Sequence, residues 1–220
     1  MFSKNYIMIL SLFFLVVISS LTMVSCSQMS AKAPVVATED MKLVDLGWDY
    51  RRLQQYPEAK DSLEKALAIN PQNIKAIIGL AWIYSDQEDY AKAEGEFAKA
   101  VNISPDDFWV HEQLGLFYRE QEKYLQAEKA FLNSLRLNFG NVTAQIGLGW
   151  AYSDQEKYAD AERQFVMAAE IAPDSDWIYL ELGYFYRDRE KYAKAKENFL
   201  KALTLNPNNL EAQTALKEIE

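Results

Sequence analysis

The five tryptophans of this sequence stand close to arginine, aspartate and tyrosine residues that could take part in binding. The set consists of Trp48, Arg51, Arg52, Trp82, Asp86, Trp109, Arg119, Trp150, Asp154, Trp177, Tyr184 and Arg187. An indole face attracts apolar and cationic side chains, and an arginine side chain pairs with a carboxylate in a fixed geometry. We therefore interpret these residues as a candidate binding surface for another protein or a peptide.

Catalytic chemistry has little support in the sequence. His111 is the only histidine, so a histidine-based metal site or a hydrolase dyad lacks its other members, and we expect this side chain to be hydrogen-bonded or to face solvent. Cys26 is the only cysteine, which excludes an internal disulfide and a cysteine-based metal cluster. We therefore expect no enzyme activity, no metal site and no cofactor.

The charge of the chain disfavours nucleic acid as a partner. The sequence has 23 lysines and arginines against 32 aspartates and glutamates, and its formal net charge is −9. Nucleic acids and anionic lipid surfaces are bound mainly by basic faces. We expect no nucleic acid partner.

The candidate binding residues recur because the chain contains a repeat. Residues 74–141 return without a gap as residues 142–209, with about half of the positions unchanged. Each copy divides into two units of about 34 residues, and an earlier, more diverged unit fits the same frame. The sequence therefore predicts five units, 40–73, 74–107, 108–141, 142–175 and 176–209, followed by a capping helix over residues 210–220.

Each unit has the pattern of two amphipathic helices separated by a polar turn. The turns end in a tyrosine: Tyr56, Tyr90, Tyr124, Tyr158 and Tyr192. The next unit is expected to begin after an N-cap residue, at Asn73, Asp107, Asn141, Ser175 and Asn209. In the first helix of the first unit, Leu46 and Tyr50 define the expected buried stripe, and Trp48 points to another face.

The units share a set of residues that identifies a family. Leu114 and Gly115 are followed by Tyr118, then by a small residue, Ala127, and an aromatic residue, Phe131. Together with a closing alanine and proline in most units, this pattern resembles the tetratricopeptide repeat over about residues 40–220. The resemblance implies an all-α fold, an α-solenoid of helix-turn-helix repeats wound into a right-handed superhelix.

The resemblance also implies a place for the candidate binding residues. Family members bind extended peptides or partner helices on a concave surface, and the tryptophan face of the first helices would lie there. A structural alternative is that neighbouring first helices pack their tryptophan rings together, with Arg119 paired to Asp86 or Asp154. Both interpretations remain open at the level of sequence.

The N-terminus has the features of an export signal. Lys4 precedes an apolar run over residues 6–18, and residues 21–26, LTMVSC, resemble the lipobox of bacterial lipoproteins. The resemblance implies a signal peptide over residues 1–25, a lipid-bearing Cys26 and a tether over residues 26–39. The alternatives are an ordinary cleaved signal with an incidental cysteine and an uncleaved anchor helix.

Three functions fit these features. The first is a scaffold in the bacterial cell envelope, lipid-anchored at Cys26, facing the periplasm from the outer membrane, and holding a protein or peptide in its tryptophan-lined groove. The second is an assembly lipoprotein that resembles the pilotins of type IV pili. The third is a glycan-binding protein, because tryptophan faces also suit sugar rings. Self-association stays open as well.

Overall fold

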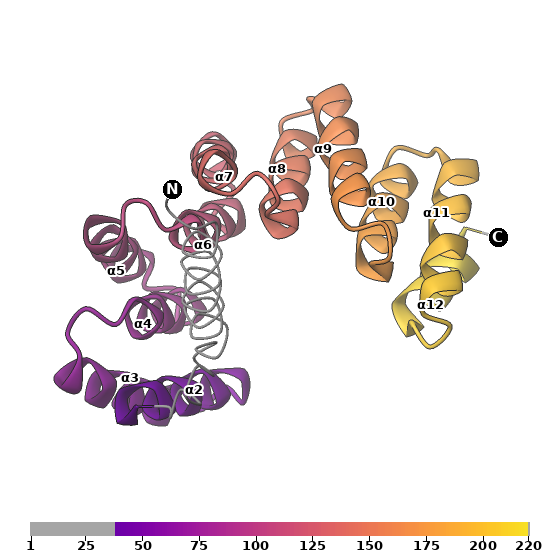
Figure 1. Ribbon diagram of the computed structural model, residues 1–220. Coiled ribbons are helices and arrows are strands. Elements are labelled where there is room, and N and C mark those ends of the chain that lie inside the picture. The colour runs from indigo at the N-terminus through magenta and orange to yellow at the C-terminus, as the bar shows by residue number, and fades with distance from the viewer. Residues whose placement is uncertain (1–37, 220) are drawn as a thin grey trace, which may run out of the picture. The chain divides into compact units, whose positions relative to one another are not determined.

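The computed structural model describes residues 38–219, which form eleven α-helices and no strands (Figure 1). The first helices of the five units are α2 (Glu39–Arg52), α4 (Ile74–Asp86), α6 (Phe108–Glu120), α8 (Val142–Asp154) and α10 (Asp176–Asp188). The second helices are α3 (Tyr56–Ile69), α5 (Tyr90–Ile103), α7 (Tyr124–Leu137), α9 (Tyr158–Ile171) and α11 (Tyr192–Leu205), and α12 (Leu210–Glu218) ends the series. This architecture confirms the predicted all-α solenoid. The expected signal peptide and Cys26 lie outside the described residues.

The helix ends follow the expected local chemistry, with one exception. Every second helix begins at the tyrosine that closes the polar turn. The side chains of Asn73, Asp107, Asn141 and Asn209 accept a backbone N–H from the first turn of the helix that follows. Ser175 also occupies an N-cap position, but its side chain makes no capping hydrogen bond.

The turn inside each unit contains one residue in the left-handed region. These residues are Gln54, Glu88, Glu122, Glu156 and Glu190, with φ between 55° and 62°. In the second unit, the N–H of Glu88 donates to the carbonyl of Ser85 and the N–H of Asp89 to that of Tyr84, both at 2.9 Å. A single left-handed residue closes the first helix in this way, and the short turn brings the second helix back against it.

The core of each unit is supplied by one face of its second helix. In α5 this face carries Ala93, Phe97 and Ala100, all of which are fully buried. Their spacing of four and three residues places them in one stripe. The corresponding residues of α7 and α9, centred on Phe131 and Phe165, are also fully buried, so the same packing repeats along the chain.

Glycine in the first helix makes room for this core. A Cβ added at Gly183 would lie 2.2 Å from the ring of Phe199, and one added at Gly115 would lie 2.7 Å from Phe131. Real Cβ atoms do not approach neighbours so closely, so the two helices of a unit can pack at this distance only because the side chain is absent.

The two sets of helices are not equivalent. The backbones of successive first helices approach one another closely from α2 to α12. Within residues 38–219, the backbones of successive second helices lie farther apart, and α9 and α11 are linked through the ion pair of Glu162 with Lys194. The side on which neighbouring helices approach most closely is the concave side of a curved array. The first helices therefore form the concave layer, and the second helices form the convex layer.

The two ends of the array differ from its interior. Leu46 was expected to be buried, but 42% of its surface is exposed, because within the described residues no unit precedes α2. Leu80, at the same position one unit later, packs in a core with Leu63 of α3. At the other end, Lys217 of α12 occupies the position that Gly149 occupies in α8. In α8 the second helix of the unit packs on this glycine, whereas in α12 a charged side chain is present. This helix packs on α10 and α11.

Candidate functional site

The twelve predicted binding residues all lie on first helices and therefore in the concave layer. Trp48, Arg51 and Arg52 belong to α2, Trp82 and Asp86 to α4, Trp109 and Arg119 to α6, Trp150 and Asp154 to α8, and Trp177, Tyr184 and Arg187 to α10. They do not form one continuous pocket. The structure instead brings most of them together in ion pairs that link successive units and in separate hollows between neighbouring first helices.

The first ion pair joins α2 to α4. The Nε and Nη2 atoms of Arg51 donate to the two carboxylate oxygens of Asp86 at 2.7 and 2.9 Å. The guanidinium carbon of Arg51 also lies 5.2 Å from the ring centroid of Trp82 and 5.6 Å from that of Trp48. Arg51 is therefore held both by a carboxylate and by two aromatic rings.

The same arrangement returns two units later. Arg119 Nε donates to Asp154 Oδ2 at 3.0 Å, and its guanidinium lies 5.5 Å from the ring centroid of Trp150. Of the two partners that the sequence left open for Arg119, the structure selects Asp154. The pairing runs from each odd-numbered unit to the even-numbered unit that follows it.

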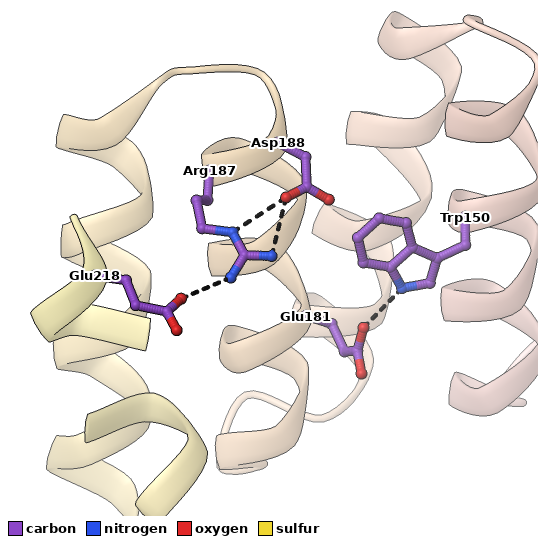
Figure 2. Close-up of polar contacts among 5 residues, drawn as sticks. All are labelled: Trp150, Glu181, Arg187, Asp188 and Glu218. Carbon is purple, nitrogen blue, oxygen red and sulfur yellow. Dashed lines mark hydrogen bonds and ion pairs between the residues drawn. The ribbon is translucent and has the colours of Figure 1, made fainter. Parts of the chain in front are cut away.

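Arg187 is the third member of this series and has different partners. Its guanidinium lies 4.7 Å from the ring centroid of Tyr184. Figure 2 shows the side chain between two carboxylates, with Nη2 3.1 Å from Asp188 and Nη1 3.3 Å from Glu218. Glu218 belongs to α12, so this pair fastens the last helix to the array.

Two tryptophans are packing residues as much as surface residues. Trp82 is 5% exposed and meets Phe97 edge to face at 5.7 Å, while Trp150 meets Phe165 at 5.2 Å. Trp48 and Trp109 of the neighbouring first helices pack against the core cluster that contains Trp82. Trp82 and Trp150 also have partners outside the first helices. Each packs on the second helix of its own unit, and each is approached by an arginine of the preceding unit.

The indole N–H groups show which tryptophans are already engaged. Trp48 donates to the carbonyl of Lys75 at 3.2 Å and Trp82 to Gln113 Oε1 at 2.8 Å. Glu181 accepts from Trp150 at 2.7 Å, as Figure 2 shows, and from Trp177 at 2.9 Å. The indole N–H of Trp109 has no acceptor among residues 38–219.

The acceptors Gln113 and Glu181 were missed in the sequence analysis, although the repeat contains a signal for them. The same position in the five units is occupied by Asp45, Gly79, Gln113, Gly147 and Glu181. Odd-numbered units thus carry a hydrogen-bond acceptor, and even-numbered units carry glycine. At Gly79 and Gly147 an added Cβ would lie 2.8 Å and 2.5 Å from Leu63 and Phe131 of the preceding second helix.

One hollow on the concave layer lies between α2, α4 and α6 and has a volume of about 530 Å³. It is lined by Val44, Asp45, Trp48, Asp49, Arg52, Lys75, Trp109 and Gln113. We call it the N-terminal hollow. It combines two indoles with charged groups of both signs, which is the composition of a site for a peptide rather than for a purely apolar ligand.

A second hollow lies between α6, α8 and α10 and has a volume of about 400 Å³. It is lined by Arg119, Trp150, Tyr184, Arg187 and Asp188. A third, of about 280 Å³, lies between α10 and α12 and shares Tyr184 and Arg187 with the second. Burial, followed by the charge of Glu211, raises the pKa of Tyr184 above its usual value. The second hollow thus contains two ion-paired arginines, the Asp188 carboxylate and a hydroxyl group.

The side chain of His111 is buried and hydrogen-bonded to the backbone. The ring is 8% exposed, and its Nε2 atom lies 2.7 Å from the carbonyl oxygen of Pro105. Among the described residues, no three acidic, histidine or cysteine side chains are grouped so that they could hold a metal ion. Within the same part of the chain, no helix is long and apolar enough to cross a membrane.

Paired helices, cores of small and aromatic residues, and a concave layer of first helices define an α-solenoid built from helix-turn-helix units. Three family models, all described as tetratricopeptide repeat, match residues 50–111, 113–176 and 178–209. The chain therefore belongs to the tetratricopeptide repeat family. No curated protein sequence matches it.

Solved structures share the fold at low sequence identity. TTC0263, a tetratricopeptide repeat protein of Thermus thermophilus, is 20% identical over 82% of this chain and 98% of its own, with a TM-score of 0.70. PilW, a type IV pilus biogenesis factor, is 21% identical over 82% of this chain and 90% of its own, with a TM-score of 0.68. YrrB, a tetratricopeptide repeat protein with an unusual peptide-binding site, is 21% identical over 81% of this chain and 92% of its own, with a TM-score of 0.56.

Proposed function

We propose that this protein is a non-enzymatic scaffold that binds a protein or peptide partner on its concave layer. The observation that carries the proposal is the N-terminal hollow, where Trp48 and Trp109 flank a space of about 530 Å³ between three helices. Tryptophan and arginine in such a position are typical of the residues that dominate binding energy in protein interfaces. The peptide-binding site of the structural neighbour YrrB supports the same kind of partner.

The proposal includes a membrane anchor at Cys26. Its support is the lipobox-like stretch LTMVSC at residues 21–26, which follows an apolar run and a single basic residue. Lipid chains contribute about 0.8 kcal/mol per buried methylene, so two or more chains hold a protein firmly on a membrane. The scaffold would then present its concave layer to partners at the surface of the outer membrane that faces the periplasm.

A narrower form of the proposal is an assembly lipoprotein for a secretin or a type IV pilus. PilW, whose fold is shared over 82% of this chain, is a type IV pilus biogenesis factor. The identity of 21% relates the folds alone, so this form rests on the lipobox-like signal and the size of the array.

Trp82 and Trp150 are poorly placed for the glycan-binding alternative. A sugar ring needs an open indole face on which to stack, and Trp82 and Trp150 are each approached by an arginine and packed on a phenylalanine. A carbohydrate would have to displace an ion-paired guanidinium to reach either ring. The indoles of Trp48 and Trp109 line the N-terminal hollow instead, and the charged groups around them favour a peptide.

Self-association by continued stacking of units is also disfavoured. Arg187 points toward the next unit, as Arg51 and Arg119 do, and α12 covers this end of the array. Arg52 occupies the same position in the first unit as Asp86 in the second unit, where Asp86 pairs with Arg51. If a second copy continued the array, its Arg52 would therefore face Arg187 of the first copy. Two arginines would then face each other, which costs free energy in a partly dehydrated contact.

Site-specific photo-crosslinking in cells tests the proposed function. A photoreactive amino acid would replace Trp109 or Tyr184 in the concave layer, and Leu125 or Val166 in the convex layer as matched controls. Leu125 and Val166 are exposed on α7 and α9. The proposal predicts adducts of defined mass from the concave positions only. Adducts from the convex positions only would contradict it.

A further inference from the structure

The N-terminal hollow contains a hydrogen-bond donor that the fold does not use. The indole N–H groups of Trp48, Trp82, Trp150 and Trp177 all donate to acceptors of this chain. Trp109 lines the hollow, and its indole N–H has no acceptor within the part of the chain that the structure describes. A half-buried donor of this kind is available to a ligand carbonyl.

The same hollow contains two charges that are not neutralised by the fold. Asp45 stands at the position where Gln113 and Glu181 accept an indole N–H from the preceding unit. Within residues 38–219 no unit precedes α2, so the Asp45 carboxylate has neither a hydrogen bond nor an ion pair there. The ammonium group of Lys75, which belongs to another wall of the hollow, likewise has no ion pair among these residues.

A ligand that covers these groups must compensate them. Removing water from an unpaired carboxylate or ammonium group is unfavourable unless an opposite charge or a hydrogen bond replaces the water. The remaining charged residues of the hollow, Asp49 and Arg52, already pair with each other. A ligand in this hollow must therefore supply a basic group for Asp45, an acidic group for Lys75 and a carbonyl oxygen for the indole N–H of Trp109.

The corresponding positions two units later do not repeat these features. Leu116 stands where Trp48 stands, and Thr143 replaces Lys75. Trp177 corresponds to Trp109, but its indole N–H is held by Glu181 at 2.9 Å. Two indoles, an unpaired acid and an unpaired base thus occur together only at the N-terminal hollow within the described array.

We infer that the N-terminal hollow anchors an extended peptide segment in which an aromatic or long aliphatic residue lies between a basic and an acidic residue. This inference rests on the proposed function and specifies the partner. The apolar side chain packs between the indoles of Trp48 and Trp109, and a peptide carbonyl accepts the N–H of Trp109. The basic residue pairs with Asp45 and the acidic residue with Lys75.

Selection of random linear peptides on phage, with the full-length chain purified in detergent, tests this inference. We expect the enriched peptides to share an apolar residue flanked by opposite charges. Replacing Trp109 with phenylalanine should weaken them about fivefold through loss of one hydrogen bond, and Asp45→Asn about tenfold. Trp177→Phe, which removes the corresponding indole two units later, is the matched control and should change affinity by less than about twofold.

Three results would overturn the inference, and they differ in what they leave standing. In the first result, the peptides bind Trp109→Phe and Asp45→Asn as tightly as the unmodified protein but do not bind Tyr184→Ala. That result would place the anchor in the hollows that Tyr184 lines. The proposed function would then stand without this anchor. Peptides unaffected by any of these substitutions, or no enrichment at all, would overturn both. Trp109→Phe and Asp45→Asn keep the fold, because the first conserves an apolar ring and Asp45 is exposed.

Discussion

Arg51 and Asp86 form a two-point ion pair between successive first helices, with distances of 2.7 and 2.9 Å and side chains only 22% and 25% exposed. The pair lies beside Trp82, so both charges are partly shielded from solvent. It fixes the orientation of α2 relative to α4 and therefore one wall of the N-terminal hollow.

A double-mutant cycle on this pair should detect coupling. We expect Arg51→Ala and Asp86→Ala to be coupled by about 1 kcal/mol of unfolding free energy, at the upper end for accessible ion pairs. Arg119 and Asp154, joined by one hydrogen bond and more exposed, serve as the comparison and should couple less. Chemical denaturation of the four variants measures this, and equal, negligible coupling in both cycles would show that neither pair orders the helices.

The glycines of the first helices should respond to substitution according to the space around them. Gly183→Ala forces a Cβ to within 2.2 Å of Phe199, and we expect it to cost about 1–3 kcal/mol. Gly149→Val should cost a similar amount against Phe165. Gly95→Ala, which meets nothing within 4 Å, should instead stabilise the protein by about 0.5–1 kcal/mol. Thermal unfolding tests the order, and a destabilised Gly95→Ala would refute the packing explanation.

Asp176 should make the stability of the C-terminal end depend on pH. Hydrogen bonds from Asn209 and Asn206, at 2.9 and 2.8 Å, lower the pKa of this carboxyl. Because the folded pKa is below the unfolded value of about 3.9, the contribution is present above that value and is lost as pH falls through the lowered pKa. Asp176→Asn should therefore be less stable than the unmodified protein at pH 7, and the difference should shrink below about pH 4.

The partners of Asp176 provide the control for this experiment. Asn206→Ala removes one of the two donors, so the pKa of Asp176 should rise toward its ordinary value. NMR titration of the carboxyl carbon measures the shift directly. An unchanged pKa in Asn206→Ala would mean that the hydrogen bond does not cause the shift.

The proposed lipid anchor predicts a change in location. Cys26→Ala removes the acceptor of the lipid chains, so we expect the protein to move from the membrane fraction to the soluble fraction. Fractionation of cells expressing each form, followed by alkaline extraction, would show this. Membrane association that persists in Cys26→Ala would favour an uncleaved anchor helix instead.

The sequence predicted most of the fold because the same local signals recur in register. Residue types at fixed spacing predicted three features correctly. These are the helix starts at the turn tyrosines, four of the five N-cap hydrogen bonds and the place of the predicted binding residues on first helices. Leu46 was placed wrongly because the repeat pattern describes an interior unit, and burial at the end of an array depends on a neighbour that need not exist.

The candidate site was predicted less completely, for two physical reasons. Arg119 lies one unit from both Asp86 and Asp154, and only the stagger of the helices decides between them. The roles of Gln113 and Glu181 depend on where an indole N–H of the preceding unit points, which the sequence does not specify. The alternation of Asp45, Gln113 and Glu181 with Gly79 and Gly147 was the available signal.

The indole N–H resonances of the five tryptophans, followed by NMR during titration with a peptide selected as above, test the central claim most directly. All five report on the concave layer, and within residues 38–219 the indole N–H of Trp109 is the one that has no acceptor. We predict that the Trp109 signal moves most and shifts downfield as its N–H meets a peptide carbonyl, while the Trp177 signal stays in place. A bound peptide that moves none of the five signals would contradict binding on the concave layer.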